Sequence, residues 1–166
     1  MLVYHGSSLK IESPDIHIGR FNLDFGKGFY VTTLPKQAEK WAMRRAVMES
    51  KAPVVSVYEF GGEHLNILAF DGYTEAWLDF IIKNRSRTPV PETPLYDAVF
   101  GNIADDDVAA AVDEYMRLLS KGRVNADVKN AMLYQLSFSQ PNNQYCLATQ
   151  KSINALTFLK SYDAEV

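Results

Sequence analysis

The sequence predicts an α+β fold, and three observations carry this prediction. Short segments rich in aromatic and β-branched residues are typical of strands, and segments with apolar residues at helical spacing lie between them. Several strand-like segments are joined by short turns, while the helical segments stand at irregular places, unlike the regular βαβ alternation of a Rossmann fold. A chain of 166 residues can bury one sizeable core, so we expect one domain over residues 1–166.

The pattern assigns each element in turn. We expect strands at 2–5, 28–33, 54–60, 65–69, 96–100, 144–149 and 156–160. The connection at 61–64 contains two glycines and predicts an antiparallel hairpin between its flanking strands. We expect helices at 36–49 after Pro35, at 74–82 with Thr74 as N-cap, from Asp105 to a stop at Gly122, and at 126–136. Three prolines make 86–94 a surface loop.

Composition excludes several classes of protein. Seventeen Lys and Arg against 20 Asp and Glu give a net charge of −3, which argues against a dedicated nucleic-acid binder but leaves nucleic acid open as a substrate. Cys146 is the single cysteine, so the sequence fits a reducing compartment. The N-terminal residues do not resemble a signal peptide, and no apolar run is long enough for a membrane span. We therefore expect a cytoplasmic protein with no membrane partner.

Metal and thiol chemistry find no support in the sequence. His5, His17 and His64 are far apart, and no metal-ligand spacing is present, so we expect no metal. Cys146 stands within an apolar strand, which favours an inert core thiol. The acidic run at 105–107 is better explained as the charged start of a helix than as a cation site.

Two segments could bind a flat ligand. His5 and Gly6 end the first strand, where an imidazole lies beside a backbone that a ligand can approach closely. Gly28 lets the chain bend into the strand that carries Tyr30, and Trp41 follows eleven residues later on the first helix. The alternative for His5 is a half-buried residue in a turn, and the alternative for both aromatic residues is the core.

These motifs resemble the ADP-ribosyltransferases of the poly(ADP-ribose) polymerase and diphtheria-toxin type. His5-Gly6-Ser7 resembles the first motif of that superfamily, and F-G-K-G-F-Y at 25–30 resembles its F-G-K-G-I-Y segment. N-Q-Y-C-L at 143–147 resembles the N-E-Y-I-V strand that carries the catalytic Glu. Segments at 22–30, 77–81 and 96–106 make most of the chain similar to a family of small bacterial proteins, domain of unknown function 3990.

The resemblance implies a split antiparallel β-core flanked by helices, with NAD+ as co-substrate in a cleft. It implies that His5 contacts the adenosine ribose, that Gly6 clamps the nicotinamide amide and that Ser7 lies beside the nucleotide. It implies that Tyr30 and Trp41 sandwich the nicotinamide ring. By the same analogy His5, Tyr30 and Gln144 are the catalytic residues, and the residues that bind NAD+ are His5, Gly6, Ser7, Gly28, Tyr30, Ala38 and Trp41.

One position departs from the superfamily. Gln144 stands where the superfamily has its Glu, and an amide carries no negative charge. We therefore expect mono-ADP-ribosyl transfer to a protein or nucleic-acid acceptor, with an inactive NAD+-binding module or an NAD+ glycohydrolase as alternatives. Asp24, Asp97 and Asp105 are the carboxylates that could substitute. The resemblance also suggests the toxic half of a toxin–antitoxin pair, with a cognate antitoxin as partner.

Overall fold

The computed structural model describes residues 1–19, 23–86, 94–104, 106–137 and 140–165. Its strands are β1 (Leu2–Ser7), β2 (Phe29–Val31), β3 (Val54–Phe60), β4 (Ile67–Ala69), β5 (Ala98–Gly101), β6 (Gln144–Leu147) and β7 (Leu156–Asp163). Its helices are the 3-10 helix η1 (Ile16–Ile18) and α1 (Pro35–Glu49), α2 (Glu75–Arg85), α3 (Asp106–Ser120), α4 (Ala126–Leu136) and α5 (Gln150–Asn154). The mixture confirms the α+β class.

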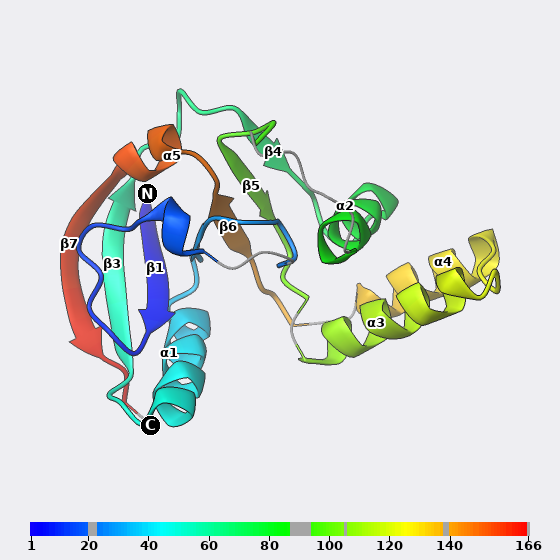
Figure 1. Ribbon diagram of the computed structural model, residues 1–166, viewed down its shortest axis with the longest axis horizontal. Coiled ribbons are helices and arrows are strands. Elements are labelled where there is room, and N and C mark those ends of the chain that lie inside the picture. Colours follow the sequence, from blue (N-terminus) through cyan, green and yellow to red (C-terminus); the bar gives the residue numbers. More distant parts are fainter. Residues whose placement is uncertain (20–22, 87–93, 105, 138–139, 166) are drawn as a thin grey trace.

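The strands form two sheets that meet at one backbone bridge. One sheet has the order β1-β3-β7 and the other the order β2-β6-β5-β4 (Figure 1). Tyr4 of β1 and Thr32, which follows β2, exchange two backbone hydrogen bonds of 2.8 and 2.9 Å. The edge strands β1 and β2 are therefore joined over a single residue pair before the sheets separate.

The predicted hairpin between 54–60 and 65–69 is wrong. β3 pairs with β1 on one edge and with β7 on the other, so it has no free edge to receive β4. β4 instead crosses to the second sheet, where it runs parallel to β5 with Ile67 opposite Ala98. The core is consequently not antiparallel throughout, because this one edge pair is parallel.

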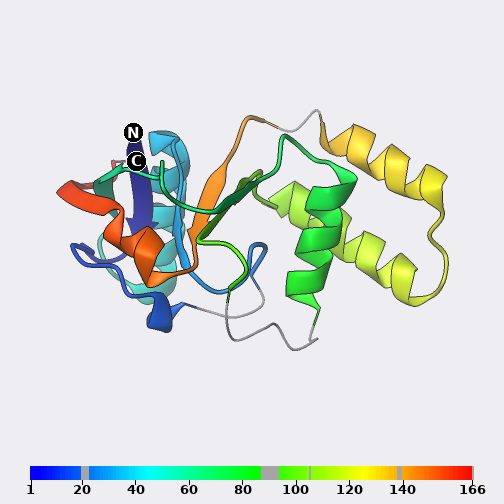
Figure 2. The same ribbon diagram turned by 90° about the horizontal axis from the view of Figure 1, so that it is seen from above.

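The two sheets pack against each other and carry helices on their outer faces. Phe29, Tyr58, Leu147 and further apolar residues of both sheets form the layer between them. Helix α1 covers the outer face of the first sheet, and α2, α3 and α4 lie beyond the second sheet, with α3 and α4 side by side (Figure 2). The outer side of the β1–β2 junction therefore lies between α1 and the other helices.

Local chemistry explains most helix starts. Pro35 occupies the first turn of α1, where its missing N–H costs nothing. The side chain of Thr74 accepts a hydrogen bond from the backbone N–H of Trp77, which confirms the predicted N-cap of α2. The sequence analysis missed α5, which Thr149 and Ser152 begin with a reciprocal capping box.

Helix α1 packs on the first sheet through three small residues. These buried residues are Ala38, Ala42 and Ala46, whereas Trp41 is exposed, so the alternative that Trp41 is a core residue is wrong.

Most of the proline-rich segment, residues 87–93, lies outside the described residues, as does position 105 at the expected start of α3. Within the described chain, no helix combines the length and apolar character needed to cross a membrane.

Gly28 provides a test of the packing between the segment before β2 and the strand β6. A Cβ at this position would lie 2.5 Å from the carbonyl oxygen of Leu147 and 2.6 Å from the Sγ of Cys146. We predict that Gly28→Ala lowers the free energy of unfolding by about 1–3 kcal/mol, because the buried strand would have to shift. Urea denaturation measures this change.

Gly61→Ala is the matched control. Its Cβ would meet only the flexible carboxylate of Glu63, at 3.4 Å, so the free energy of unfolding should change by no more than about 0.5 kcal/mol. Equal losses in the two variants would contradict the packing assigned to Gly28.

Candidate functional site

The first two sequence motifs meet at the β1–β2 junction. The Nδ1 of His5 lies 2.6 Å from the backbone carbonyl oxygen of Tyr30. Because a carbonyl oxygen only accepts, Nδ1 carries the proton and Nε2 is left as the acceptor nitrogen of the neutral ring. The imidazole also stacks on Phe29, with ring centroids 4.3 Å apart. His5 is thus held by β2 on two sides.

The third motif strand lies on the other side of β2. β6 pairs antiparallel with β2, placing Cys146 opposite Tyr30 and Tyr145 opposite Val31. Side chains alternate along a strand, so Gln144 projects to the same face as Cys146 and Tyr30. The structure therefore brings the three predicted motif strands together in the order β1, β2, β6, although the chain separates them widely.

A hydrogen-bonded clamp fixes the start of β6. The side chain of Asn143 accepts from the backbone N–H of Thr33 and from the hydroxyl of Thr32, at 3.0 and 3.1 Å. The side-chain amide of Gln37 on α1 makes two hydrogen bonds to the backbone of Asn143. It donates to the carbonyl oxygen at 2.6 Å and accepts from the N–H at 3.2 Å. The position of Gln144 is consequently set from both β2 and α1.

The sequence analysis quoted Asn143 within the third motif but missed Gln37. A lone glutamine in the first turn of a helix carries no pattern that distinguishes it from a solvated residue. Only the fold shows that it faces the backbone of Asn143, 106 residues further along the chain.

The side chain of Gln144 is buried, and its amide nitrogen has no partner in the described part of the chain. The residue retains only 9% of its exposure, and its Nε2 has no hydrogen-bond acceptor among the described residues. A buried amide left unpaired costs about 1–3 kcal/mol, and nearly all such groups in proteins are satisfied. The amide of Gln144 therefore keeps a donor that the described residues do not satisfy.

Burial controls the ionisation of the other two predicted catalytic residues. Burial lowers the pKa of His5 below its ordinary value, so its imidazole is neutral at pH 7. Burial, and then Cys146 and Asp24, raise the pKa of Tyr30 well above its ordinary value. The Tyr30 hydroxyl donates to the carbonyl oxygen of Gly26 at 2.6 Å and accepts from the N–H of Phe25 at 3.2 Å. This hydroxyl is a structural group and not a base.

The glycines of the motifs have packing roles in the protein as it stands. A Cβ on Gly6 would lie 1.9 Å from the carbonyl oxygen of Ala38 and 2.7 Å from the backbone nitrogen of Ala42, so Gly6 allows α1 to rest on β1. Ala38 itself is fully buried in this contact. Ser7 ends β1 opposite Val54 and is half-buried.

Trp41 is exposed and lines a cavity. The cavity has a volume of about 310 Å³ and lies between the first turns of α1 and the segments that precede α3 and β6. The guanidinium of Arg44 lies 5.4 Å from the centre of the Trp41 ring. No ring contact joins Trp41 to Tyr30 among the described residues, but Gln37 and Asn142 of the cavity wall adjoin Asn143 and Gln144.

The substitute carboxylates are engaged elsewhere. Asp24 pairs with Arg85 at 2.7 Å and accepts from the N–H of Ala104. Asp97 lies at the opposite end of β5 from Gln144, where hydrogen bonds from the N–H of Asn66 and from Lys151 lower its pKa. The side chain of Asp105 lies outside the described residues.

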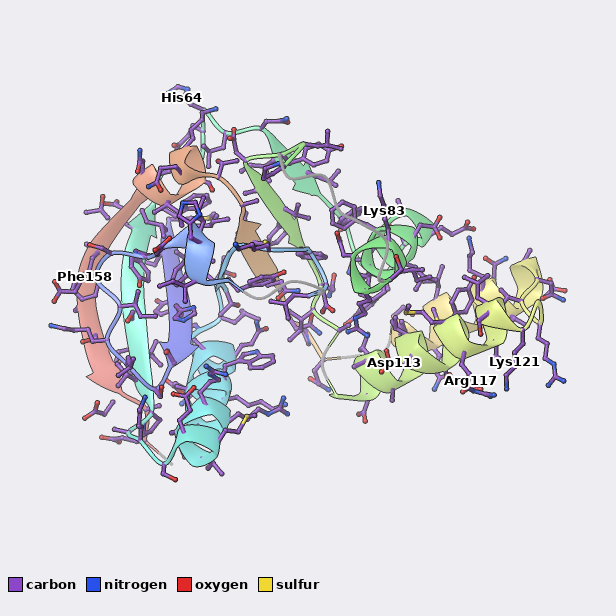
Figure 3. The ribbon with its side chains drawn as sticks, viewed as in Figure 1. His64, Lys83, Asp113, Arg117, Lys121 and Phe158 are labelled. Carbon is purple, nitrogen blue, oxygen red and sulfur yellow. The ribbon has the colours of Figure 1, made fainter. Side chains whose placement is uncertain are left out.

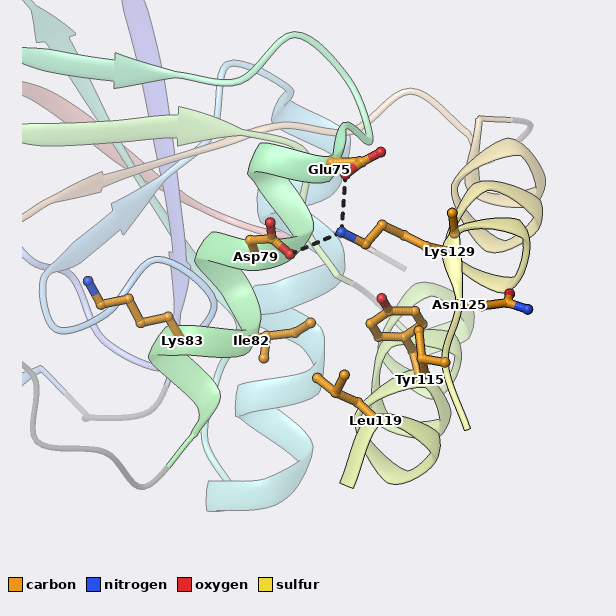
Figure 4. A pocket seen from close by; sticks show the side chains of 10 residues that line it. Glu75, Asp79, Ile82, Lys83, Tyr115, Leu119, Asn125 and Lys129 are labelled. Carbon is orange, nitrogen blue, oxygen red and sulfur yellow. Dashed lines mark hydrogen bonds and ion pairs between the residues drawn. The ribbon is translucent and has the colours of Figure 1, made fainter. Parts of the chain in front are cut away.

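Two further groups do not belong to the site. A larger cavity of about 520 Å³ lies between α2, α3 and α4, where Lys129 contacts Glu75 at 3.1 Å and Asp79 at 3.7 Å (Figure 4). None of the motif residues lines it.

Cys146 is fully buried, and burial raises the pKa of its thiol to about 12, as expected for an inert core thiol. No cluster of three metal-ligating side chains occurs in the described ranges.

Comparison with known proteins gives a family without an established activity. The fold and the junction define an α+β protein in which three motif strands lie side by side in the order β1, β2, β6, with a buried glutamine at the start of β6. Residues 1–158 match the family described as protein of unknown function (DUF3990). The chain belongs to this family. No curated protein and no solved structure matches it.

The half-buried imidazole of His5 predicts a pH-dependent stability. His5 stays neutral in the fold, whereas in the unfolded chain it takes up a proton as the pH falls through about 6.5. The unfolded state then binds more protons, so the free energy of unfolding should fall as the pH is lowered from 7.5 to 5.5. Urea denaturation across this range, in the wild type and in His5→Gln, isolates the contribution.

The variant loses the titrating ring and keeps every other group. We expect its free energy of unfolding to depend less on pH than that of the wild type. An equal or steeper loss in His5→Gln would show that His5 is protonated in the folded protein.

Proposed function

We propose that this protein is an NAD+-dependent mono-ADP-ribosyltransferase. The observation that carries the proposal is the unpartnered amide of Gln144, buried at the start of the strand that resembles the catalytic strand of ADP-ribosyltransferases. Such a donor is matched to a ligand hydroxyl or ring oxygen, and the resemblance supplies the ribose next to nicotinamide as that group.

The arrangement of the motif strands supports the proposal. A chance likeness in three short motifs would not require them to be neighbours, yet β1, β2 and β6 adjoin in that order. The two sheets also separate at the β1–β2 junction, which is the kind of split core that the resemblance implies. The acceptor and the cognate antitoxin stay predictions of the resemblance.

The residues would act by binding and positioning. The bond between nicotinamide and the anomeric carbon breaks, nicotinamide leaves with the electron pair, and an acceptor nucleophile forms the new bond while its proton passes to water. Gln144 would hold the nicotinamide ribose, and the Nε2 of His5 would accept from the adenosine ribose. Trp41 would stack on the nicotinamide ring from α1.

A specific observation favours a second candidate, an inactive NAD+-binding module. Neither Asp24 nor Asp97 is available to replace the missing carboxylate, since each is held by other partners. An amide donor without a nearby base binds a ribose but does not deprotonate an acceptor. This candidate predicts NAD+ binding without release of nicotinamide.

Incubation with NAD+ labelled on the adenylate separates these candidates. We expect nicotinamide release and transfer of label to a macromolecule when a bacterial lysate is present. Release without labelled macromolecule would identify a glycohydrolase instead, and binding without release would identify the inactive module. Absence of NAD+ binding by calorimetry would refute the proposed function.

A Gln144→Leu variant distinguishes a ligand-binding amide from a structural one. Leucine removes a buried donor that has no partner, so the free energy of unfolding should stay the same or rise, by at most about 2 kcal/mol. The affinity for NAD+ should fall at least tenfold, which corresponds to about 1.4 kcal/mol. Denaturation and calorimetry measure the two effects.

Gln135→Leu, an exposed glutamine on α4, is the control and should leave the NAD+ affinity unchanged. If Gln144→Leu instead lowers stability and keeps the affinity, Gln144 belongs to the core and the assignment is wrong.

A further inference from the structure

Gln37 joins the helix that carries Trp41 to the strand that carries Gln144. It belongs to the first turn of α1, one turn before Trp41, and both residues line the cavity of about 310 Å³. Residues four apart on a helix lie on nearly the same side, so Gln37 and Trp41 are neighbours on α1. The amide of Gln37 is already engaged, because it donates to the carbonyl oxygen of Asn143 at 2.6 Å and accepts from its N–H at 3.2 Å. Gln37 is therefore a link between two elements and not a ligand group.

Two hydrogen bonds from one planar amide fix both a distance and an orientation. A side-chain amide presents a donor and an acceptor side by side, which matches the N–H and C=O of one extended backbone residue. Here that residue is Asn143, directly before β6 begins at Gln144. The side chain of Asn143 is held separately, since its Oδ1 accepts from the hydroxyl of Thr32 and from the N–H of Thr33. Gln37 thus ties α1 to a point that is also fixed from the end of β2.

Helix α1 rests on the first sheet, whereas Gln37 reaches the second. The buried alanines of α1 pack against β1, where Gly6 lets the helix approach closely. Glu39 accepts a hydrogen bond of 3.1 Å from the hydroxyl of Tyr162 on β7, in the same sheet. The two bonds of Gln37 cross from α1 to the segment that leads into β6, in the other sheet. They therefore act on the placement of α1 relative to β6.

The proposed function makes this placement important. Under that proposal Trp41 stacks on the nicotinamide ring, and Gln144 holds the ribose to which the ring is attached. The bond between ring and ribose is the one that breaks, so α1 and β6 hold its two sides. A displacement of about 1 Å in such an arrangement can cost about 100-fold in rate. NAD+ is sensitive to the spacing of α1 and β6, whereas ADP-ribose, which has no nicotinamide, is not.

We infer that Gln37 is a positioning residue that sets the affinity of the site for NAD+ relative to its affinity for ADP-ribose. The inference rests on the proposed function. When the amide of Gln37 is removed, Asn143 keeps its bonds to Thr32 and Thr33, so the start of β6 stays in place. The first turn of α1 loses its bonds to β6, and the ring and the ribose are then no longer held in one geometry.

Three variants test the inference. Gln37→Met keeps the length of the side chain and removes both hydrogen bonds. Gln140→Met makes the same exchange at an exposed glutamine of the same cavity wall. Phe158→Ala lowers stability away from the site, because Phe158 packs on Tyr58 from β7, at the edge of the first sheet that is remote from β6 (Figure 3). Calorimetry measures the affinities for NAD+ and ADP-ribose, and urea denaturation measures the free energy of unfolding.

We expect Gln37→Met to bind NAD+ about tenfold or more weakly than the wild type, and ADP-ribose about threefold more weakly at most. Gln140→Met and Phe158→Ala should keep the ratio of the two affinities within about twofold, although Phe158→Ala unfolds at a lower urea concentration. Trp41→Ala should weaken NAD+ binding about tenfold in the wild type but about threefold at most in Gln37→Met, because residues that act together are not additive.

Gln37→Glu decides the question if Gln37→Met does not fold. Its carboxylate still accepts from the N–H of Asn143 but cannot donate to the carbonyl oxygen, so one of the two bonds remains. We expect its affinity for NAD+ to fall about threefold or more relative to its affinity for ADP-ribose. An unchanged ratio in this variant would contradict the inference.

Different results overturn the inference and the proposed function. Equal losses of NAD+ and ADP-ribose affinity in Gln37→Met, or no loss, show that Gln37 has only a structural role. An equal change of the ratio in Gln140→Met shows that the polarity of the cavity wall is responsible and also overturns the inference. Both results leave the transferase standing. Absence of NAD+ binding in the wild type overturns the proposed function and the inference together.

Discussion

The architecture depends on the single bridge between Tyr4 and Thr32. Two backbone hydrogen bonds hold β1 and β2 together there, and beyond them the sheets separate so that their inner faces pack on each other. This separation places α1 and the helices α2–α4 on the outer faces with the junction between them. The imidazole of His5 adds a hydrogen bond to the carbonyl oxygen of Tyr30, so the first motif is part of the β1–β2 junction.

A buried donor without a partner is an unfavourable feature that packing alone would remove. Most side chains around the junction are satisfied: the hydroxyl of Tyr30 by Gly26 and Phe25, and the amide of Asn143 by Thr33. Against this background the Nε2 of Gln144, unpaired among the described residues, is a local exception next to Asn143, whose backbone Gln37 holds. Unfavourable groups of this kind are characteristic of binding sites, because the ligand supplies the missing bond.

Elements whose signals are local were predictable, and elements that depend on distant partners were not. The spacing of apolar residues and the cap Thr74 defined α2 from the sequence, and the helix expected at 126–136 is α4, whose N-cap Asn125 only the structure revealed. The path of β4 was not predictable, because glycines at 61 and 62 permit a hairpin while both edges of β3 are taken by strands that are distant in the sequence, β1 and β7. The exposure of Trp41 follows in the same way from the packing of α1 through its alanines.

The sequence by itself determined the fold class, most helix and strand positions and the three motifs with Gln144 among them, since each depends on residue type and short-range spacing. Only the tertiary structure decided that these motifs are neighbours and that Gly6 and Gly28 are required by close backbone packing. It alone decided that the amide nitrogen of Gln144 is buried without a partner among the described residues. It also placed the exposed ring of Trp41 beside a cavity. Burial and hydrogen bonding are properties of surroundings assembled from distant segments, which no local pattern encodes.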